Sequence, residues 1–189
     1  HWIDDGHSIC TEIRNQYGSR LTVDGNGGAY FIWSDERNSS FPEMEVFLQH
    51  INSENEESFE SNGLSITEAP YKQELPLIRK DGYGGAFAIW GDWRTGGSVG
   101  INIQHIDPEY GVTLETDGLE VYFDIDGDVE KGFIGSLYLG NDKSLIYWQD
   151  QRWNPFSIET YGKIIDASYN PPLYDHGNSL STNPNQLNP

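Results

Sequence analysis

Apolar and polar residues alternate over short runs of this chain, and turns rich in glycine, asparagine and proline separate the runs. In residues 29–37, alternation puts Phe31 and Trp33 on one side of an extended chain and Tyr30 and Ile32 on the other. Both sides are apolar where the run begins. This pattern predicts a strand in a sheet that is covered on both faces by other sheets.

The same pattern predicts strands along the whole chain, and no segment has the period of an amphipathic helix. The predicted strands are an early one within residues 1–23, followed by 29–37, 45–51, 75–79, 86–94, 99–106, 118–123, 133–138, 145–152 and 157–165.

A sequence motif recurs at a fixed spacing. Residues 24–37 and 81–94 both read Asp-Gly-x-Gly-Gly-Ala-x-x-x-Trp-x-Asp-x-Arg, and residues 140–152 hold a diverged third copy. Their tryptophans, Trp33, Trp90 and Trp148, are 57 and 58 residues apart. Such a period is the signature of a repeat architecture. The predicted repeat units are 6–62, 63–117 and 118–176, with a further unit beginning at 177–189.

About four antiparallel strands in each repeat, covered on both faces, are typical of a β-propeller blade. The predicted fold is therefore an all-β propeller segment, residues 1–189, that forms an incomplete ring. The segment would be a fragment of a larger propeller or would close with another chain, because about four blades are the usual minimum for a ring. A β-sandwich or an open solenoid remains the alternative.

The repeated pattern, followed by a strand that ends Ile-x-x-Gln-x-Ile-Asp (residues 101–107), resembles secreted bacterial β-propeller repeat proteins. Many proteins of this family are type IX-sorted surface proteins. The resemblance implies an extracellular or cell-surface location and implies no settled biochemical activity. The third copy departs from the pattern, because Leu139, Asp142 and Lys143 replace the aspartate and both glycines.

Composition narrows the range of partners. The chain carries 30 acidic and 11 basic residues, a formal net charge of −19, which disfavours nucleic acid and anionic membrane as partners. No run approaches 18 apolar residues, so we expect no membrane span. Cys10 is the single cysteine, so no disulfide forms within the chain.

The repeated polar residues have a structural and a functional interpretation. Asp35 and Arg37 follow Trp33, and their counterparts follow the other two tryptophans. Because catalytic groups seldom recur identically in every repeat, we favour a buried tryptophan followed by an Asp–Arg pair that holds the strand end. His50 and His105 are also equivalent, and the third unit has Ile164 in their place, which favours a packing role over a ligand or catalytic role.

One acidic stretch lies outside the repeat plan. Asp124, Asp126 and Asp128 alternate within residues 124–130 and could converge on Ca²⁺ if the backbone turns. The loop does not match an EF-hand, because Gly127 stands fourth where the motif has its glycine sixth. Calcium is the one cofactor that the sequence suggests, and a solvated acidic loop is the alternative.

Two hypotheses for function follow. The first is a non-catalytic extracellular propeller module, a binding or scaffold part of a larger secreted or cell-surface bacterial protein. Its partners would be other propeller blades, another chain, or a protein or glycan ligand. The second is a carbohydrate-active propeller enzyme, a glycoside hydrolase or polysaccharide lyase, whose carboxylates gather at the channel mouth. Trp93, Trp153 and Tyr169 could then stack on sugar rings, and packing within loops is the alternative for these three side chains. No residue is nominated as catalytic.

Overall fold

The computed structural model describes residues 6–38, 43–97, 99–123, 134–141, 143–150, 158–166 and 178–180. These residues form thirteen strands and no helix, and all strand pairs are antiparallel, which confirms the predicted all-β class. No helix among them is long and apolar enough to cross a membrane.

The strands form three sheets, each built from one stretch of the chain. The first sheet contains β1 (Gln16–Val23), β2 (Ala29–Asp35), β3 (Glu45–Ile51) and β4 (Leu64–Ser65), in that order. The second contains β5 (Gln73–Lys80), β6 (Ala86–Asp92), β7 (Gly100–Asp107) and β8 (Gly111–Val112), with β9 (Leu119–Phe123) also paired to β7. The third contains β10 (Ile134–Gly140), β11 (Lys143–Asp150), β12 (Glu159–Ile165) and β13 (Asn178–Ser179).

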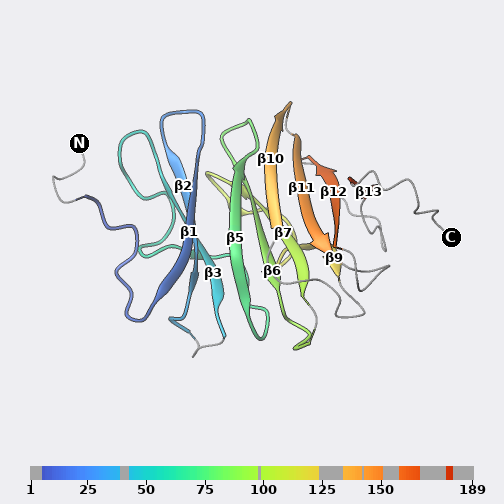
Figure 1. The fold of residues 1–189 in the computed structure, drawn as a ribbon. Helices are drawn as coiled ribbons and strands as arrows, with labels where there is room; N and C mark the ends of the chain where they lie inside the picture. The colour runs from blue at the N-terminus through green and yellow to red at the C-terminus, as the bar shows by residue number, and fades with distance from the viewer. Residues whose placement is uncertain are drawn as a thin grey trace.

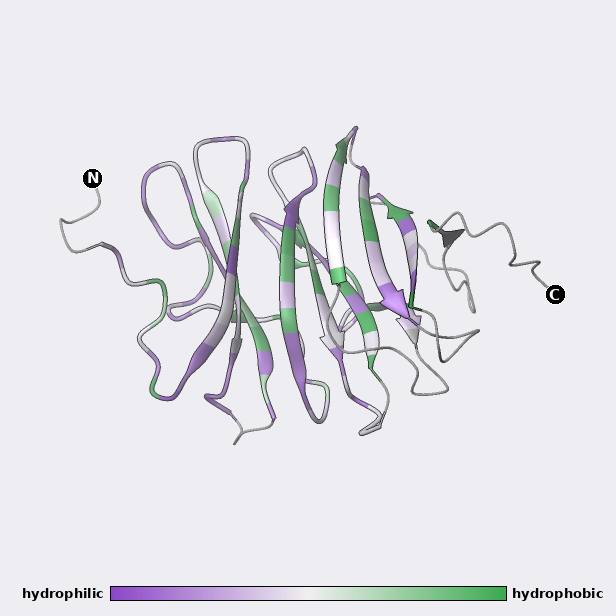
Figure 2. Ribbon diagram, in the orientation of Figure 1, coloured by the Kyte–Doolittle hydropathy of each residue, from purple (hydrophilic) through white to green (hydrophobic). Residues whose placement is uncertain are grey.

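The sheets stand face to face in a row (Figure 1), with β1, β5 and β10 next to one another. Each is an open sheet, and the row does not close into a ring. Apolar residues are concentrated in the strands (Figure 2), as the alternation in the sequence predicts.

Two apolar layers hold the row together, one between each pair of sheets. The layer between the first and second sheets contains Tyr30, Ile32, Val46, Leu48, Ile66, Ile78, Ala86, Ala88, Trp90 and Ile106. The layer between the second and third sheets contains Phe87, Ile89, Ile101, Ile103, Val121, Tyr122, Ile146, Trp148, Tyr161 and Ile165. The middle strand β6 is buried along its whole length because its two faces belong to different layers.

The strand ends differ from the prediction at the repeated motif. β2 ends at Asp35 and β6 at Asp92, two residues before the predicted ends, because each aspartate turns back to accept the N–H of the arginine that follows it. The first strands of the first two sheets, β1 and β5, also carry a bulge that the sequence pattern did not indicate. Gly18 and Leu75, at φ of 62° and 57°, lie within these bulges.

Candidate functional site

Each repeated tryptophan is buried and donates to the aspartate two residues later. The Nε1 atoms of Trp33, Trp90 and Trp148 lie 2.8, 2.9 and 3.0 Å from their carboxylates. The carboxylates belong to Asp35, Asp92 and Asp150. A buried indole N–H without a partner would be destabilising, so the aspartate satisfies a need that burial creates.

The arginine of the motif completes the cluster in the first two sheets. Arg94 binds Asp92 through two contacts, Nε to Oδ1 at 2.9 Å and Nη2 to Oδ2 at 2.6 Å, and also donates to the Asp117 carbonyl. Arg37 likewise donates to Asp35 and to the Asn62 carbonyl. The pairing ties the end of β2 to the loop before β4 and the end of β6 to the loop before β9, as the structural interpretation predicts. Arg152 lies outside the described residues.

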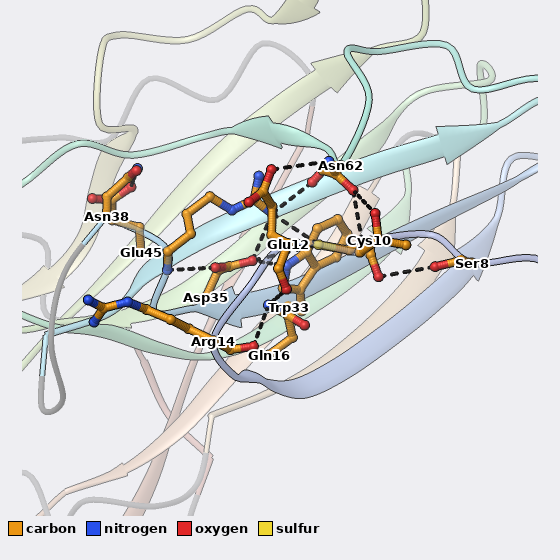
Figure 3. Close-up of polar contacts among 12 residues, drawn as sticks. Ser8, Cys10, Glu12, Arg14, Gln16, Trp33, Asp35, Asn38, Glu45 and Asn62 are labelled. Carbon is orange, nitrogen blue, oxygen red and sulfur yellow. Dashed lines mark hydrogen bonds and ion pairs between the residues drawn. The ribbon is translucent and has the colours of Figure 1, made fainter.

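The first copy also contacts the segment that precedes β1 (Figure 3). The Cys10 Sγ is 3.2 Å from Arg37 Nη2, and the backbone N–H of Thr11 donates to Asn62 Oδ1. In the second sheet, Glu68 N donates to Asp117 Oδ1 in the same way. The cluster therefore anchors the chain entering each of these two sheets.

A second polar set lies at the opposite end of the strands of the first sheet, beside the hairpin turn between β1 and β2. His50 Nε2 is 3.0 Å from Asp24 Oδ2, and His50 Nδ1 is 2.7 Å from Ser58 Oγ. The other oxygen of Asp24 accepts the backbone N–H groups of Asn26 and Gly28. Carboxylate, imidazole and hydroxyl thus form one continuous hydrogen-bonded chain.

The second sheet repeats this set. His105 Nε2 is 2.9 Å from Asp81 Oδ2, and His105 Nδ1 is 2.8 Å from Thr113 Oγ1. Asp81 Oδ1 accepts the N–H groups of Tyr83 and Gly85. An alanine Cβ at Gly85 would meet Asp81 and the Ile106 carbonyl, which explains the second glycine of the Gly-Gly pair.

The pKa values of the two carboxylates determine which groups donate the hydrogen bonds to them. Burial alone would raise the pKa of Asp24 and of Asp81, but their backbone N–H donors and the partner histidine outweigh it and lower both pKa values. An ionised carboxylate only accepts, so the Nε2–H of each histidine donates to it, while Nδ1 is hydrogen-bonded to the hydroxyl oxygen. These are the residue types of a nucleophilic triad, although here the hydroxyl bonds Nδ1 and the carboxylate bonds Nε2.

Tyr30 joins the two sets across the interface between sheets. Its ring stacks on His50 with the ring centroids 4.2 Å apart, and its hydroxyl donates to the Gly84 carbonyl in the turn of the second sheet. Burial, with Asp81 and Asp24 nearby, raises the pKa of Tyr30. The phenol therefore stays protonated and holds the turn of one sheet against its neighbour.

The other sequence-predicted candidates are placed as follows. Trp93 is half-buried, with Lys72 Nζ 4.7 Å from its ring centroid and its ring near Gly91, which fits loop packing. Asp124, Asp126 and Asp128 lie outside the described residues, as do Trp153 and Tyr169. Within the described part of the chain, no three His, Cys, Asp or Glu side chains are grouped to hold a metal ion.

Comparison with protein families found no matching family, and comparison with curated proteins found no match. Among solved structures, the endo-arabinase from Bacteroides thetaiotaomicron VPI-5482 is similar, with 13% sequence identity and a TM-score of 0.49. The match covers 82% of this chain and 59% of the length of that chain.

Proposed function

We propose that this chain is a non-catalytic, extracellular β-propeller module that acts as a binding or scaffold part of a larger secreted or cell-surface bacterial protein. Each sheet would be one blade, built on four antiparallel strands, and the blades would belong to the repeat family that the sequence resembles. Face-to-face packing of consecutive sheets, with the strands β1, β5 and β10 adjacent, supports this proposal.

The observation that carries the proposal is the duplication of the polar sets. Asp24, His50 and Ser58 contact one another as Asp81, His105 and Thr113 do. The tryptophan–aspartate–arginine clusters are repeated in the same manner. A catalytic centre needs one set of catalytic residues at one place. Equivalent hydrogen-bonded sets in neighbouring repeats instead stabilise the fold that the repeats share.

A matched pair of variants tests this role. We expect Asp24→Asn and Asp81→Asn to lower the free energy of unfolding by similar amounts, about 1–3 kcal/mol each, because each weakens the same buried hydrogen bonds. Urea titration of both variants measures the two losses. Equal losses of stability support a structural role for both polar sets. If one set were a binding site instead, its substitution would cost little stability and would abolish binding of a ligand.

Incubation with a panel of neutral and acidic polysaccharides tests the catalytic alternative. We expect no new reducing ends and no unsaturated products, while a glycan array or a pull-down from the same panel reports binding. Product release that a single carboxylate substitution abolishes, without loss of folding, would replace the module by a glycoside hydrolase or polysaccharide lyase.

A further inference from the structure

The first strands of the three sheets, β1, β5 and β10, lie next to one another (Figure 1) and have a charge balance opposite to that of the whole chain. Their one acidic residue, Glu74, is bonded to Lys72 at 2.7 Å. On the same strands, Arg20, Arg79 and Lys80 have no carboxylate partner within the described part of the chain. A chain with 30 acidic and 11 basic residues thus keeps unpaired cations on these strands.

Arg79 is fixed at the junction of the second and third sheets, both of which are described. It is half-buried, its Nε donates to the Ser136 carbonyl of β10 at 2.9 Å, and its Nη1 donates to the Ile78 carbonyl at 2.7 Å. Its Nη2 has no hydrogen-bond partner among the described residues. Two carbonyl groups therefore orient the guanidinium and leave the N–H groups of Nη2 to bind a ligand.

Another half-buried arginine has the anion that Arg79 lacks. Arg94 Nη2 is 2.6 Å from Asp92 Oδ2, and this hydrogen bond raises the pKa of Arg94. Burial instead lowers the pKa of Arg79, and only Tyr147 opposes the effect. Because a guanidinium does not lose its proton in a protein, Arg79 is a partly dehydrated cation without a counter-charge in the described part of the chain.

Two buried hydroxyl groups face the same apolar layer as Arg79. Ser136 is 7% exposed and Ser144 is fully buried, and neither Oγ has a hydrogen-bond partner in the described part of the chain. Ser136 pairs with Ile146, and Ser144 stands two residues before Ile146, so both side chains are on the face that packs on the second sheet. Arg79 pairs with Phe87 of that layer. Unpaired buried hydroxyls are costly, so these donors favour a site that an acceptor ligand completes.

Lys80 supplies a second cation beside the same stretch of β10. Its Nζ is 5.3 Å from the centroid of the Tyr138 ring. Tyr138 is two residues after Ser136, a separation of about 7 Å along an extended chain. The lysine side chain is long and flexible, so its ammonium group can reach an anion that Arg79 holds.

We propose that Arg79 and Lys80, with the hydroxyl groups of Ser136 and Ser144, form a binding site for one oxyanion group, the carboxylate of an acidic sugar or a sulfate. This inference deepens the proposed function, since it names a ligand chemistry for the binding module. The arginine fork suits two oxygens of such a group, and a serine hydroxyl donates to a further one. The net charge of −19 repels anions in general, so local contacts have to hold a bound one.

Nuclear magnetic resonance of the ¹⁵N-labelled protein tests the site through the Nε–H signal of Arg79. The probes are galacturonate and galactose, which differ by a carboxylate, and inorganic sulfate, all at one ionic strength. We expect an anionic probe to shift the signal and galactose to leave it unchanged. A response to galacturonate assigns the site to sugar acids, and a response to sulfate alone assigns it to sulfate groups. No shift with either anion up to about 50 mM, a range that includes affinities near about 10 mM, would overturn the proposal.

A matched pair of variants separates the site from the general field of the strands, with the backbone amide signals of Ser136 and Tyr138 as the readout. Arg79→Gln should raise the dissociation constant of the anion at least about tenfold. Arg20→Gln removes the same charge from β1, where the guanidinium is bonded to carbonyls of its own strand, and should change the constant less than about twofold. Equal losses in the two variants would show a diffuse effect of charge, and the proposed site would be wrong.

Ser144→Ala separates binding from packing. The Ser144 hydroxyl has no partner in the described part of the chain, so the midpoint of urea unfolding should stay the same or rise. The dissociation constant should nevertheless rise about threefold, because the anion loses one donor. An unchanged constant would contradict the site as proposed. Any of these failures leaves the comparison of Asp24→Asn with Asp81→Asn untouched, so the oxyanion site and the proposed function fail separately.

Discussion

Alanine at Gly118 should destabilise the protein through two separable costs. Gly118 has φ of +73°, in the left-handed region that side chains with a Cβ avoid. A Cβ there would lie 2.5 Å from the Ile103 carbonyl oxygen and 2.6 Å from Trp90 Cη2. Neither neighbour is a flexible side-chain end, because one is backbone in β7 and the other is a fully buried indole.

Three further glycines separate the two costs. Gly25 has φ of +93° with open space around its Cβ position, so it carries only the backbone cost. Gly85 is outside the left-handed region, but its Cβ would meet Asp81 and the Ile106 carbonyl, so it carries only the steric cost. Gly97 carries neither.

The expected magnitudes follow from these assignments. The left-handed backbone costs about 1–2 kcal/mol for a residue with a Cβ. Forcing extra volume into a packed site costs about 1–3 kcal/mol. Gly118→Ala should therefore lower the free energy of unfolding by about 2–5 kcal/mol, more than either Gly25→Ala or Gly85→Ala. Gly97→Ala should be neutral or stabilising by about 0.4–1 kcal/mol, because alanine restricts the unfolded chain.

Urea denaturation, followed by tryptophan fluorescence and by circular dichroism, measures all four variants. The two signals must give coincident transitions and the four variants a common m value for the differences to be read as free energies. A loss for Gly118→Ala no larger than that for Gly25→Ala would show that Trp90 and β7 do not constrain this glycine, and the proposed packing of the tryptophan would be wrong.

The remaining predictions concern the polar clusters and the acidic stretch. Trp90→Ala should cost roughly 3–5 kcal/mol in a denaturant titration, as truncation of a buried tryptophan does, and a loss under about 1 kcal/mol would contradict its burial. Arg94→Lys keeps the charge but loses the two-point contact with Asp92, so stability should fall by about 1 kcal/mol and Arg94→Ala should cost more. Because the pKa of Asp81 is lowered in the folded protein, the unfolded chain binds a proton at this carboxylate at a higher pH than the folded protein does. The free energy of unfolding should therefore fall as the pH drops below about 4. Asp81→Asn should make the melting temperature depend less on pH in this range. Calorimetric titration with Ca²⁺ should show a heat of binding that Asp126→Ala removes if residues 124–130 form a calcium site, and no heat in the unmodified protein would end that hypothesis.

The strands could be predicted from the sequence because the alternation of apolar residues is strong wherever both faces are covered. Predicted strands 45–51 and 86–94 correspond to β3 and β6, the latter with a shift at its end. The two-residue strands β4, β8 and β13 were not predicted as separate elements. A pair of residues is too short to show a period, and its position depends on the neighbouring strand rather than on its own sequence.

The hydrogen bonds of the two histidines could not be predicted from sequence motifs. Asp24 and His50 are far apart in sequence, and neither has a metal-ligand or triad spacing to its neighbours, so their bond depends on the registers of β1 with β2 and of β2 with β3. One signal could have found it: a hydroxyl residue stands eight positions after each histidine, Ser58 after His50 and Thr113 after His105. Recurrence of such an offset in two repeats indicates a repeated contact without giving its geometry.

The third repeat separates the two polar devices by what it keeps and what it loses. It keeps the bond between Trp148 and Asp150, because that indole is buried between the second and third sheets and its N–H needs an acceptor. It loses both members of the aspartate–histidine pair together, and Leu139 and Ile164 stand in their places. Loss of one member alone would leave a buried polar group without its partner, so the pair is kept or replaced as a unit. The tryptophan–aspartate bond is therefore the part of the repeat that every described sheet requires. The residues at the position of the aspartate–histidine pair, at the other end of the strands, can differ between repeats according to what packs against them.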